Sequence, residues 1–576
     1  MSKVLQSHTA AEVTGLWGRM KVYHGGAWAK MRSAADLYAH NFSYLEDTVP
    51  EGVDIHAPST ASSVIDVFRD NIRVDTLIPF RDDWGTSKKA REAKALLLRL
   101  DAYIIKKIRD QSPVDPFAQA AFDEPLRGAA AWCIGYDKAR WPEEMPDHTE
   151  EEHERFMAER ALSFPFTVTP IDPLSLAPAP GAAWPLPWCI EYRQLSWDEV
   201  AREYPNWPIT KLYESGARVD VYKFWEEPNE SVPNGLRIVV ADGLEALNEA
   251  NPFGFVPYVF EYSGWGRLNY DNDPSNLAVN LLEKAESEIV AEARLKTAMD
   301  AAWQFTVFPR LLTTEDPRSV KIRWDLSSGG ILQVTGLGPD QRPTWLEQPQ
   351  IDSAMYNFLP VVQQSIQRAT YSSALEGSRQ PGVDFGYLQS LLVGQASLRK
   401  DAVIRSLQRL YSHGIELIER AMVHLDVGPI LLGPGTEGER ERMVTAKDIG
   451  NRFETRIKVE AADPSERDRK MLAWLSPLRA GAISKRTYLT EGMGRTDPDE
   501  ELAAMYEEIV IQQLVMSGIV SQTILQELAV EEQVEKLQEG AESAVRGAQK
   551  ATVPEGLPGV PSTQESPVER SPLSVL

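Results

Sequence analysis

The chain has 576 residues, which exceeds one ordinary hydrophobic core and predicts about two to four structural regions. Apolar residues make up 43% and charged residues 25%, as in folded globular proteins. With 84 acidic and 60 basic residues the formal net charge is −24, which argues against tight, static binding to nucleic-acid phosphates.

Two cysteines, Cys133 and Cys189, are too few for a disulfide framework or a Cys-based zinc site, and they suit a reducing cytoplasm. The best apolar stretch, Ile509–Val520, is about a dozen residues long, whereas a membrane-spanning helix needs about 20. The first residues lack the apolar core of a signal peptide. We therefore expect neither secretion nor membrane insertion.

The first part of the chain predicts helices. A helical pattern over about 9–45 is interrupted at Gly25–Gly26, and Pro58-Ser59-Thr60 starts another helix, with hydroxyls available to cap it. Ser87–Ile108 is strongly amphipathic, and a strand is expected near Ala131–Tyr136.

From about Phe164 to Tyr262 the pattern changes to short β-strands divided by Pro, Gly and Asp-Gly turns. One helical insert, Ser196–Tyr204, opens with a capping box of Ser196 and Glu199. Five tryptophans in or near this region are expected to pack in its core: Trp141, Trp184, Trp188, Trp207 and Trp225.

Asp273–Gln304 predicts the clearest helix, about 45 Å long, with Asp273 as its cap and Pro274 in its first turn. One side is apolar from Leu277 to Ile289. The other side carries acidic residues that we interpret as a solvated face: Glu283, Glu286, Glu288 and Glu292.

Short β-like pieces follow that helix, and a second helix begins after Pro349 with a kink expected at Pro360. The gap between Ala369 and Tyr387 has no periodicity for roughly 17 residues, and loops above about 12–15 residues are usually functional or disordered. A long helix is expected from Tyr387 to Leu425, then a strand within Thr455–Asp468 and C-terminal helices.

The sequence offers little for catalysis. It has no phosphate-binding G-x-x-x-x-G-K-[ST], no G-x-S-x-G and no His-Glu-x-x-His motif. His148 and His153 are five residues apart, which does not place two ligands on one helix face, and Thr149 with Glu152 reads more simply as a capping box. We expect no catalytic residues, no metal and no cofactor, and hence no enzyme.

The order of these parts resembles the portal proteins of tailed bacteriophages, from about residue 50 to 530. The segments that carry the resemblance are APSTASSVIDVF, DPFAQAAFDEPLRGAAAWCIGYD, IDPLSLAPAP with WCIEYRQLSWDEVAREYPNW, VDVYKFWEE and NPFGFVPYVFEY. The resemblance implies an α+β, mainly helical subunit with wing, stem, clip and crown regions, which assembles as a ring with a central channel.

Carried onto this chain, the resemblance implies the following regions. They are an N-terminal helical extension (1–50), an α/β wing (51–272), a first stem helix (273–304), a clip (305–349), a second stem helix (350–369), a tunnel loop (370–386), a long helix with returning wing strands (387–462), a helical crown (463–540) and a disordered tail (541–576).

The implied function is that of a ring of twelve subunits at the unique capsid vertex, assembled in the host cytoplasm and retained in the virion. It would be the conduit for packaging and ejection of double-stranded DNA. Its implied partners are further copies of the chain, the major capsid protein, the terminase large subunit and the head–tail adaptor proteins.

The resemblance also implies two sets of site residues. Tunnel-loop residues would meet moving DNA, and their glycines and mixed charges suit a mobile segment that does not adhere: Glu376, Gly377, Ser378, Arg379, Gln380, Pro381, Gly382 and Asp384. Clip residues would dock terminase and adaptors: Arg310, Arg318, Lys321, Arg323 and Trp324. The acidic remainder of the chain would repel phosphates and leave the passage loose.

Two other readings remain open on the sequence alone. The chain could be a helical scaffold or adaptor that forms no ring, or a hydrolase with an acidic site. Closed symmetry separates the ring from both, because a ring requires head-to-tail contacts that close.

Overall fold

The computed structural model describes residues 9–43, 55–82, 88–142, 149–181, 184–209, 214, 216–307, 311–314, 331–334, 344–345, 353–370, 400–432 and 442–461, with isolated positions between 474 and 506. The chain divides into two units, Met1–Lys470 and Met471–Leu576. All helices and strands below belong to the first unit, which is a mixed α/β structure with open sheets.

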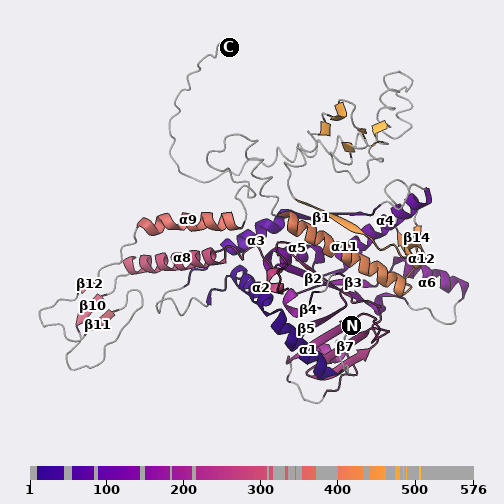
Figure 1. Ribbon diagram of the computed structural model, residues 1–576, viewed down its shortest axis with the longest axis horizontal. Helices are drawn as coiled ribbons and strands as arrows, with labels where there is room; N and C mark the ends of the chain where they lie inside the picture. The colour runs from indigo at the N-terminus through magenta and orange to yellow at the C-terminus, as the bar shows by residue number, and fades with distance from the viewer. Residues whose placement is uncertain are drawn as a thin grey trace, which may run out of the picture. The chain divides into compact units, whose positions relative to one another are not determined.

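A five-stranded antiparallel sheet forms one layer, with neighbouring strands joined in the order β4-β5-β6-β7-β8 (Figure 1). Alternate residues point to opposite faces, so Phe224 contacts helices α1 and α2 while Val221 packs beneath α7. The elements of this layer are α1 (Ala10–Tyr23), α2 (Gly25–Tyr38), β4 (Leu176–Pro178), β5 (Trp188–Ser196), α7 (Trp197–Glu203), β6 (Arg218–Glu226), β7 (Leu236–Ala241) and β8 (Leu244–Glu249).

These elements confirm most of the sequence predictions for their part of the chain. The N-terminal helical stretch is divided at His24, directly before Gly25. Ser196 and Glu199 form the predicted capping box at the start of α7. Of the five tryptophans, Trp141, Trp207 and Trp225 are buried, and Trp184 and Trp188 are half-buried.

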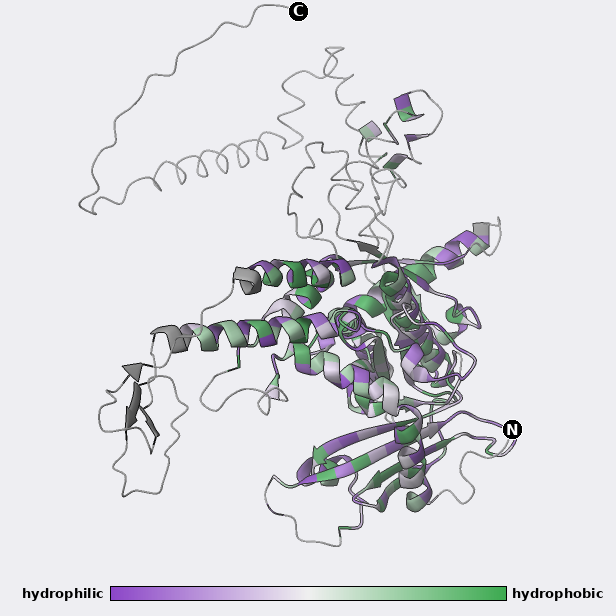
Figure 2. Cartoon of the chain, turned by 60° about the vertical axis from the view of Figure 1, so that its left-hand side comes forward, coloured by the Kyte–Doolittle hydropathy of each residue, from purple (hydrophilic) through white to green (hydrophobic). Residues whose placement is uncertain are grey.

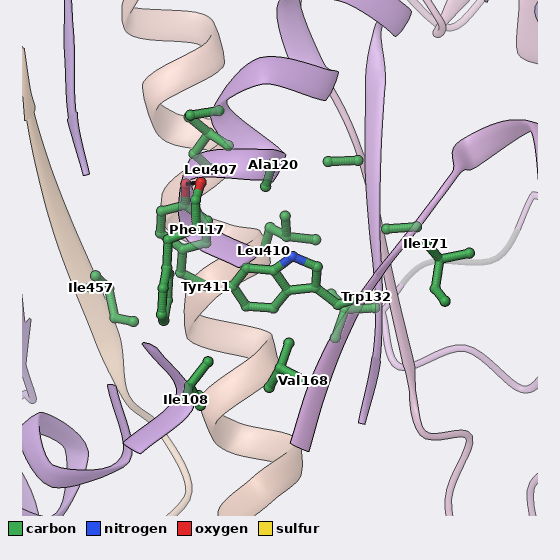
Figure 3. Packing of buried hydrophobic residues seen from close by; sticks show 14 of the residues in the cluster. Ile108, Phe117, Ala120, Trp132, Val168, Ile171, Leu407, Leu410, Tyr411 and Ile457 are labelled. Atoms are coloured by element: carbon green, nitrogen blue, oxygen red, sulfur yellow. Dashed lines mark hydrogen bonds between the residues drawn. The ribbon is translucent and has the colours of Figure 1, made fainter. Parts of the chain in front are cut away.

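A second sheet, ordered β3-β2-β9, supports the largest core together with helices α5 and α11. Trp132 of β2 stacks on Tyr411 of α11 with ring centroids 5.2 Å apart, and Phe117 of α5 meets both rings edge-on (Figure 3). The Tyr411 hydroxyl donates to the Phe117 carbonyl oxygen at 2.7 Å. The elements are α5 (Pro116–Arg127), β2 (Ala129–Tyr136), β3 (Phe166–Ile171), β9 (Tyr258–Tyr262) and α11 (Lys400–His424).

Two strands far apart in sequence, β1 and β15, pair antiparallel on another side of α11. The β15 residues Ile457 and Val459 are buried, and the Ile457 amide donates to Ser412 Oγ of α11 at 3.0 Å. This pairing confirms the strand predicted after Thr455. Its surroundings are α3 (Thr60–Asp70), β1 (Ile72–Phe80), α4 (Lys88–Gln111) and β15 (Arg456–Ala461).

The capping prediction at the start of α3 is wrong. Ser59 occupies the N-cap position but its side chain makes no capping hydrogen bond, and the Thr60 hydroxyl instead donates to Glu292 at 2.7 Å. A tertiary partner has therefore replaced the local one.

The helix predicted over Asp273–Gln304 is wrong for the residues before Glu286. Asp273 and Pro274 begin only a short 3-10 turn, after which the chain is irregular as far as Ala285. The helix α8 runs from Glu286 to Val307. Leu281, Leu282 and Ala285 are buried in the largest core, as predicted for apolar residues, but from non-helical backbone.

The remaining elements include helix α9, which pairs with α8, the strands at the end of that pair, and several short elements. They are η2 (Lys138–Arg140), α6 (Glu150–Leu162), η3 (Pro173–Ser175), η4 (Pro274–Asn276), β10 (Leu311–Thr314), β11 (Ile331–Val334), β12 (Thr344–Trp345), α9 (Ser353–Ala369), β13 (Ile430–Leu432), β14 (Arg442–Val444) and α12 (Ala446–Ile449).

Both cysteines are free thiols, Cys189 buried and Cys133 half-buried. Among the described residues, no helix is both long enough and apolar enough to cross a membrane.

Gly414 of α11 provides a test of this core. A Cβ on Gly414 would lie 2.7 Å from Cε3 of Trp132, so the Trp132–Tyr411 stack requires glycine there. We expect Gly414→Ala to lower the thermal midpoint, because overpacking costs about 1–3 kcal/mol and the helix-propensity gain returns only about 1 kcal/mol. The matched control is Gly18→Ala in α1, where nothing lies within 4 Å of the new methyl group and the midpoint should rise slightly. Equal shifts in both variants would contradict the packing described for Trp132.

Candidate functional site: the projecting helix pair

Helices α8 and α9 lie side by side and extend away from the sheets, with strands β10, β11 and β12 at their far end (Figure 1). Strand β10 pairs parallel to β11 and antiparallel to β12. The chain therefore runs out along α8, turns through a small sheet and returns along α9. The same pair is seen from another direction in Figure 2, where both helices carry hydrophobic as well as hydrophilic residues.

Apolar side chains hold the two helices together. Ile289 and Ala293 of α8 and Ile366 of α9 are buried, as is Val362 one turn before Ile366. The two residues on each helix are four positions apart, which places them on one side of that helix. Helix α9 continues through Pro360, whose side chain lies on the exposed part of the helix.

Glu292 is the polar centre of the pair, and its side chain is fully buried. Thr60 Oγ1 donates to it at 2.7 Å, Gln363 Nε2 at 3.1 Å, and Lys296 Nζ lies 2.9 Å away. Burial would raise the pKa of Glu292, but these donors outweigh it and hold the pKa below its usual value. The prediction that Glu292 belongs to a solvated face is wrong, because its carboxylate joins α3, α8 and α9.

The neighbouring acidic residues fix the base of the pair to the N-terminal helix α2. Lys30 Nζ lies 2.6 Å from Glu283 Oε1 and also donates to the Ser275 carbonyl oxygen at 2.8 Å. Ser33 donates to Glu286 through a short hydrogen bond. Further along α8, the His56 amide donates to Thr297 Oγ1 at 2.9 Å. The helix pair is thus attached at its base by polar contacts from several elements.

The outer side of the pair carries large apolar residues that this chain leaves exposed. Trp303 of α8 is 58% exposed, and Phe358 and Val361 of α9 are 54% and 57% exposed. Phe358 and Val361 are three residues apart and therefore share one side of α9. The sequence placed these residues within predicted helices but did not mark them as exposed, because their exposure depends on which sides of α8 and α9 meet.

The tunnel-loop residues predicted from the resemblance, Glu376 to Asp384, lie outside the described residues, as do the five predicted clip residues and Tyr387 to Arg399 at the start of the predicted long helix. The segment between α9 and α11 has described residues at both of its ends. These are Thr370 and Lys400, and both are buried. The Thr370 hydroxyl donates to the Ile366 carbonyl oxygen at 2.7 Å, and Lys400 Nζ donates to Asn71 Oδ1 at 3.2 Å. The structure thus fixes the points where this segment leaves α9 and enters α11.

Three ionised or ionisable side chains meet inside the core around α11. Arg81 Nε and Nη2 donate to Asp101 at 2.8 and 2.6 Å, and Nη2 also makes a short contact with Glu419 of α11. All three side chains are fully buried. Burial raises the pKa of Glu419 well above its usual value, because one guanidinium faces two carboxylates. Arg81 also donates to the Arg452 carbonyl oxygen at 2.8 Å, next to β15, so this cluster joins α4, α11 and the β1–β15 pair.

Another buried carboxyl group, that of Glu124, lies between α5 and α11. Ser406 Oγ is 3.0 Å from Glu124 Oε1, and Oε2 has no hydrogen-bond partner among the described residues. Burial raises the pKa of Glu124 well above its usual value. The neutral form of the Glu124 carboxyl group is therefore favoured over the carboxylate. Glu124 serves as a packing contact between α5 and α11.

Only one member of the histidine pair considered as a metal site lies in the described part of the chain, so the pair is not tested. His153 lies in α6, whose start carries the predicted capping box of Thr149 and Glu152, and His148 lies outside the described residues. The described residues contain no cluster of three or more His, Cys, Asp and Glu side chains that could hold a metal ion.

Comparison with known proteins adds no relative. No model of a protein family matches the chain, and no curated protein is significantly similar to it.

The opposite pKa shifts of Glu124 and Glu292 give a paired prediction. Because the folded-state pKa of Glu124 is raised, wild-type stability falls as pH rises above the ordinary glutamate pKa of about 4.3, and Glu124→Gln should remove that loss. Because the pKa of Glu292 is lowered, its contribution is complete above about pH 4.3 and is lost on acidification.

Thermal midpoints measured from about pH 2.5 to about pH 8 check both signs. Relative to the wild type, Glu124→Gln should gain stability as pH rises, whereas Glu292→Gln should lose it. Parallel curves for the two variants would show that the buried environments of these residues have been misassigned.

Proposed function

We propose that the chain is a portal-like subunit that assembles into a closed ring and serves as a conduit for double-stranded DNA. The observation that carries the proposal is the helix pair α8–α9, which projects from the α/β body, ends in a small sheet and exposes Trp303, Phe358 and Val361. Large apolar side chains on an extended helix pair favour contact with another protein surface. Head-to-tail contact between identical copies would cover them in every subunit.

Two further features support the proposal. The long helix α11 follows the segment assigned to the tunnel loop, and its first residue, Lys400, is anchored against Asn71 at the end of α3. The net charge of −24 disfavours tight DNA binding, which suits a passage through which DNA must move. The docking of terminase and adaptors on residues 305–349, the virion location and the count of twelve remain part of this proposal, through the resemblance.

The mass and shape of the purified protein test the proposal directly. Twelve copies of the 64.4 kDa chain amount to about 773 kDa, and we expect light scattering near that mass with a central hole in negative-stain images. A chain that stays monomeric at high concentration and with its capsid proteins would favour the scaffold or hydrolase readings.

Substitutions on the exposed side of α9 test the observation that carries the proposal. We expect Phe358→Asp with Val361→Asp to abolish or strongly weaken assembly, because each apolar side chain buried at a contact contributes about 1.5–3 kcal/mol. The matched control is Val22→Asp with Leu162→Asp, which changes two exposed apolar residues on other helices and should leave the assembly mass unchanged. If both double variants assemble like the wild type, the subunit contact does not involve this side of α9.

Removal of Gly377–Gly386 tests the assignment of the loop. We expect the shortened chain to form rings of normal mass, because this segment would line the passage and make no contact that holds subunits together. DNA packaging or retention should be impaired in a packaging assay. Failure of the shortened chain to form rings would make the segment an assembly element and would overturn its assignment.

A further inference from the structure

Helix α4 has a charge opposite to that of the rest of the molecule. Its 24 residues include eight lysines and arginines and three acidic residues, in a chain whose net charge is −24. One of the three acids, Asp101, is buried and bonded to Arg81. The periodicity of Ser87–Ile108 predicted this helix but not its excess of basic charge, because alanines and leucines separate the basic residues in the sequence.

Three of the basic residues share one side of α4. Arg91, Arg99 and Lys106 are eight and seven residues apart, which places the three within about 80° of one another round the helix. Arg91 and Lys106 are exposed and Arg99 is half-exposed, whereas the opposite side buries Leu97, Leu100, Ile104 and Ile108 in the largest core. This basic face spans about 22 Å along the helix at 1.5 Å per residue.

Two small residues lie within the basic face. Ala95 and Ala102 lie between its charged residues and are both exposed. Small side chains at these positions allow another backbone to approach while the longer basic side chains reach around it. Arg109 lies at the end of the helix, where it donates to the carbonyl oxygens of Val74 and Asp75, and the face is defined by the three residues that precede it.

We propose that the basic face of α4, defined as Arg91, Arg99 and Lys106, docks on the acidic surface of a neighbouring copy of this chain. The inference rests on the proposed ring. Two copies that each carry a charge of −24 repel one another over most of their surface, and α4 is where an approaching acidic surface is attracted. A head-to-tail contact joins two different faces of the subunit, so a basic face can meet an acidic one at every contact round a ring.

Charge complementarity favours a second copy over nucleic acid as the occupant. Outside α4 the chain is more negative than its total of −24, so a DNA duplex would have to approach against the field of the whole subunit. A second copy carries the same excess of acidic surface to the contact. Contacts that the basic residues make within their own chain do not remove the imbalance, because α4 has five more basic than acidic residues.

Charge reversal on the basic face tests the inference. We expect Arg91→Glu with Arg99→Glu and Lys106→Glu to weaken assembly at least about tenfold, measured as the protein concentration at half-maximal ring mass by light scattering. The matched control is Lys21→Glu with Arg202→Glu and Lys447→Glu, which reverses three exposed basic residues on other elements and changes the net charge equally. We expect the control to assemble within about twofold of the wild type, and added salt to weaken wild-type assembly more than that of the α4 variant.

A neutral variant, with Gln at the same three positions of α4, keeps the test decisive if the charge-reversed protein does not fold. It should weaken assembly in the same direction by a smaller factor, and circular dichroism should show a wild-type melting curve. If both α4 variants assemble like the wild type, the inference is overturned while the ring stands. If they assemble normally but lose affinity for a fluorescent DNA duplex, α4 is a nucleic-acid surface instead. A wild-type chain that never forms a closed assembly overturns the proposed function, and the inference with it.

Discussion

The burial of α11 is the constraint on which the described unit depends. This 25-residue helix contacts the β3-β2-β9 sheet, helix α5 and the β1–β15 pair, so most of its circumference faces protein, while Asp401, Arg405 and Arg409 remain exposed. The polar residues on its buried sides cannot be solvated, and each of them must find a partner in the surrounding elements. Glu419 meets Arg81, Ser412 accepts from Ile457, Ser406 meets Glu124, and Lys400 donates to Asn71. These four contacts position α11 against elements that lie far from it in sequence.

The Arg81 cluster is the most demanding of these contacts. Removing one partner of a buried ion pair typically costs about 3–5 kcal/mol, because the remaining charge stays buried. The cluster therefore fixes α11 to α4 and to the start of β15 in one arrangement. Gly414 makes a comparable demand through shape, since the approach of Trp132 leaves no room for a side chain. Charge and packing thus specify the same position for one helix.

The helix pair α8–α9 contrasts with this interior. Its inward side is satisfied by Glu292 and a small set of apolar residues, and its base is held by Lys30 and Ser33. Its outer side exposes Trp303, Phe358 and Val361, and α4 presents basic residues on an acidic molecule. The buried polar residues of α11 thus have partners within the chain, whereas these two surfaces remain exposed. Assembly with further copies would cover the first with apolar contacts and the second with opposite charge.

The sequence by itself determined the local structure wherever a local signal was strong. Periodicity predicted α4, the strands between Phe164 and Tyr262, and the strand β15, and side-chain spacing predicted the capping boxes at Ser196 and Thr149. It failed where a distant residue outweighed the local signal. Asp273 and Pro274 are good helix starters, yet the residues after them are buried in the core without forming a helix, and Thr60 bonds to Glu292 and leaves its own helix uncapped. Only the tertiary structure decided which acidic residues are buried and which sides of α9 and α4 are exposed. Those properties depend on neighbours brought together from distant parts of the chain, which no local pattern encodes.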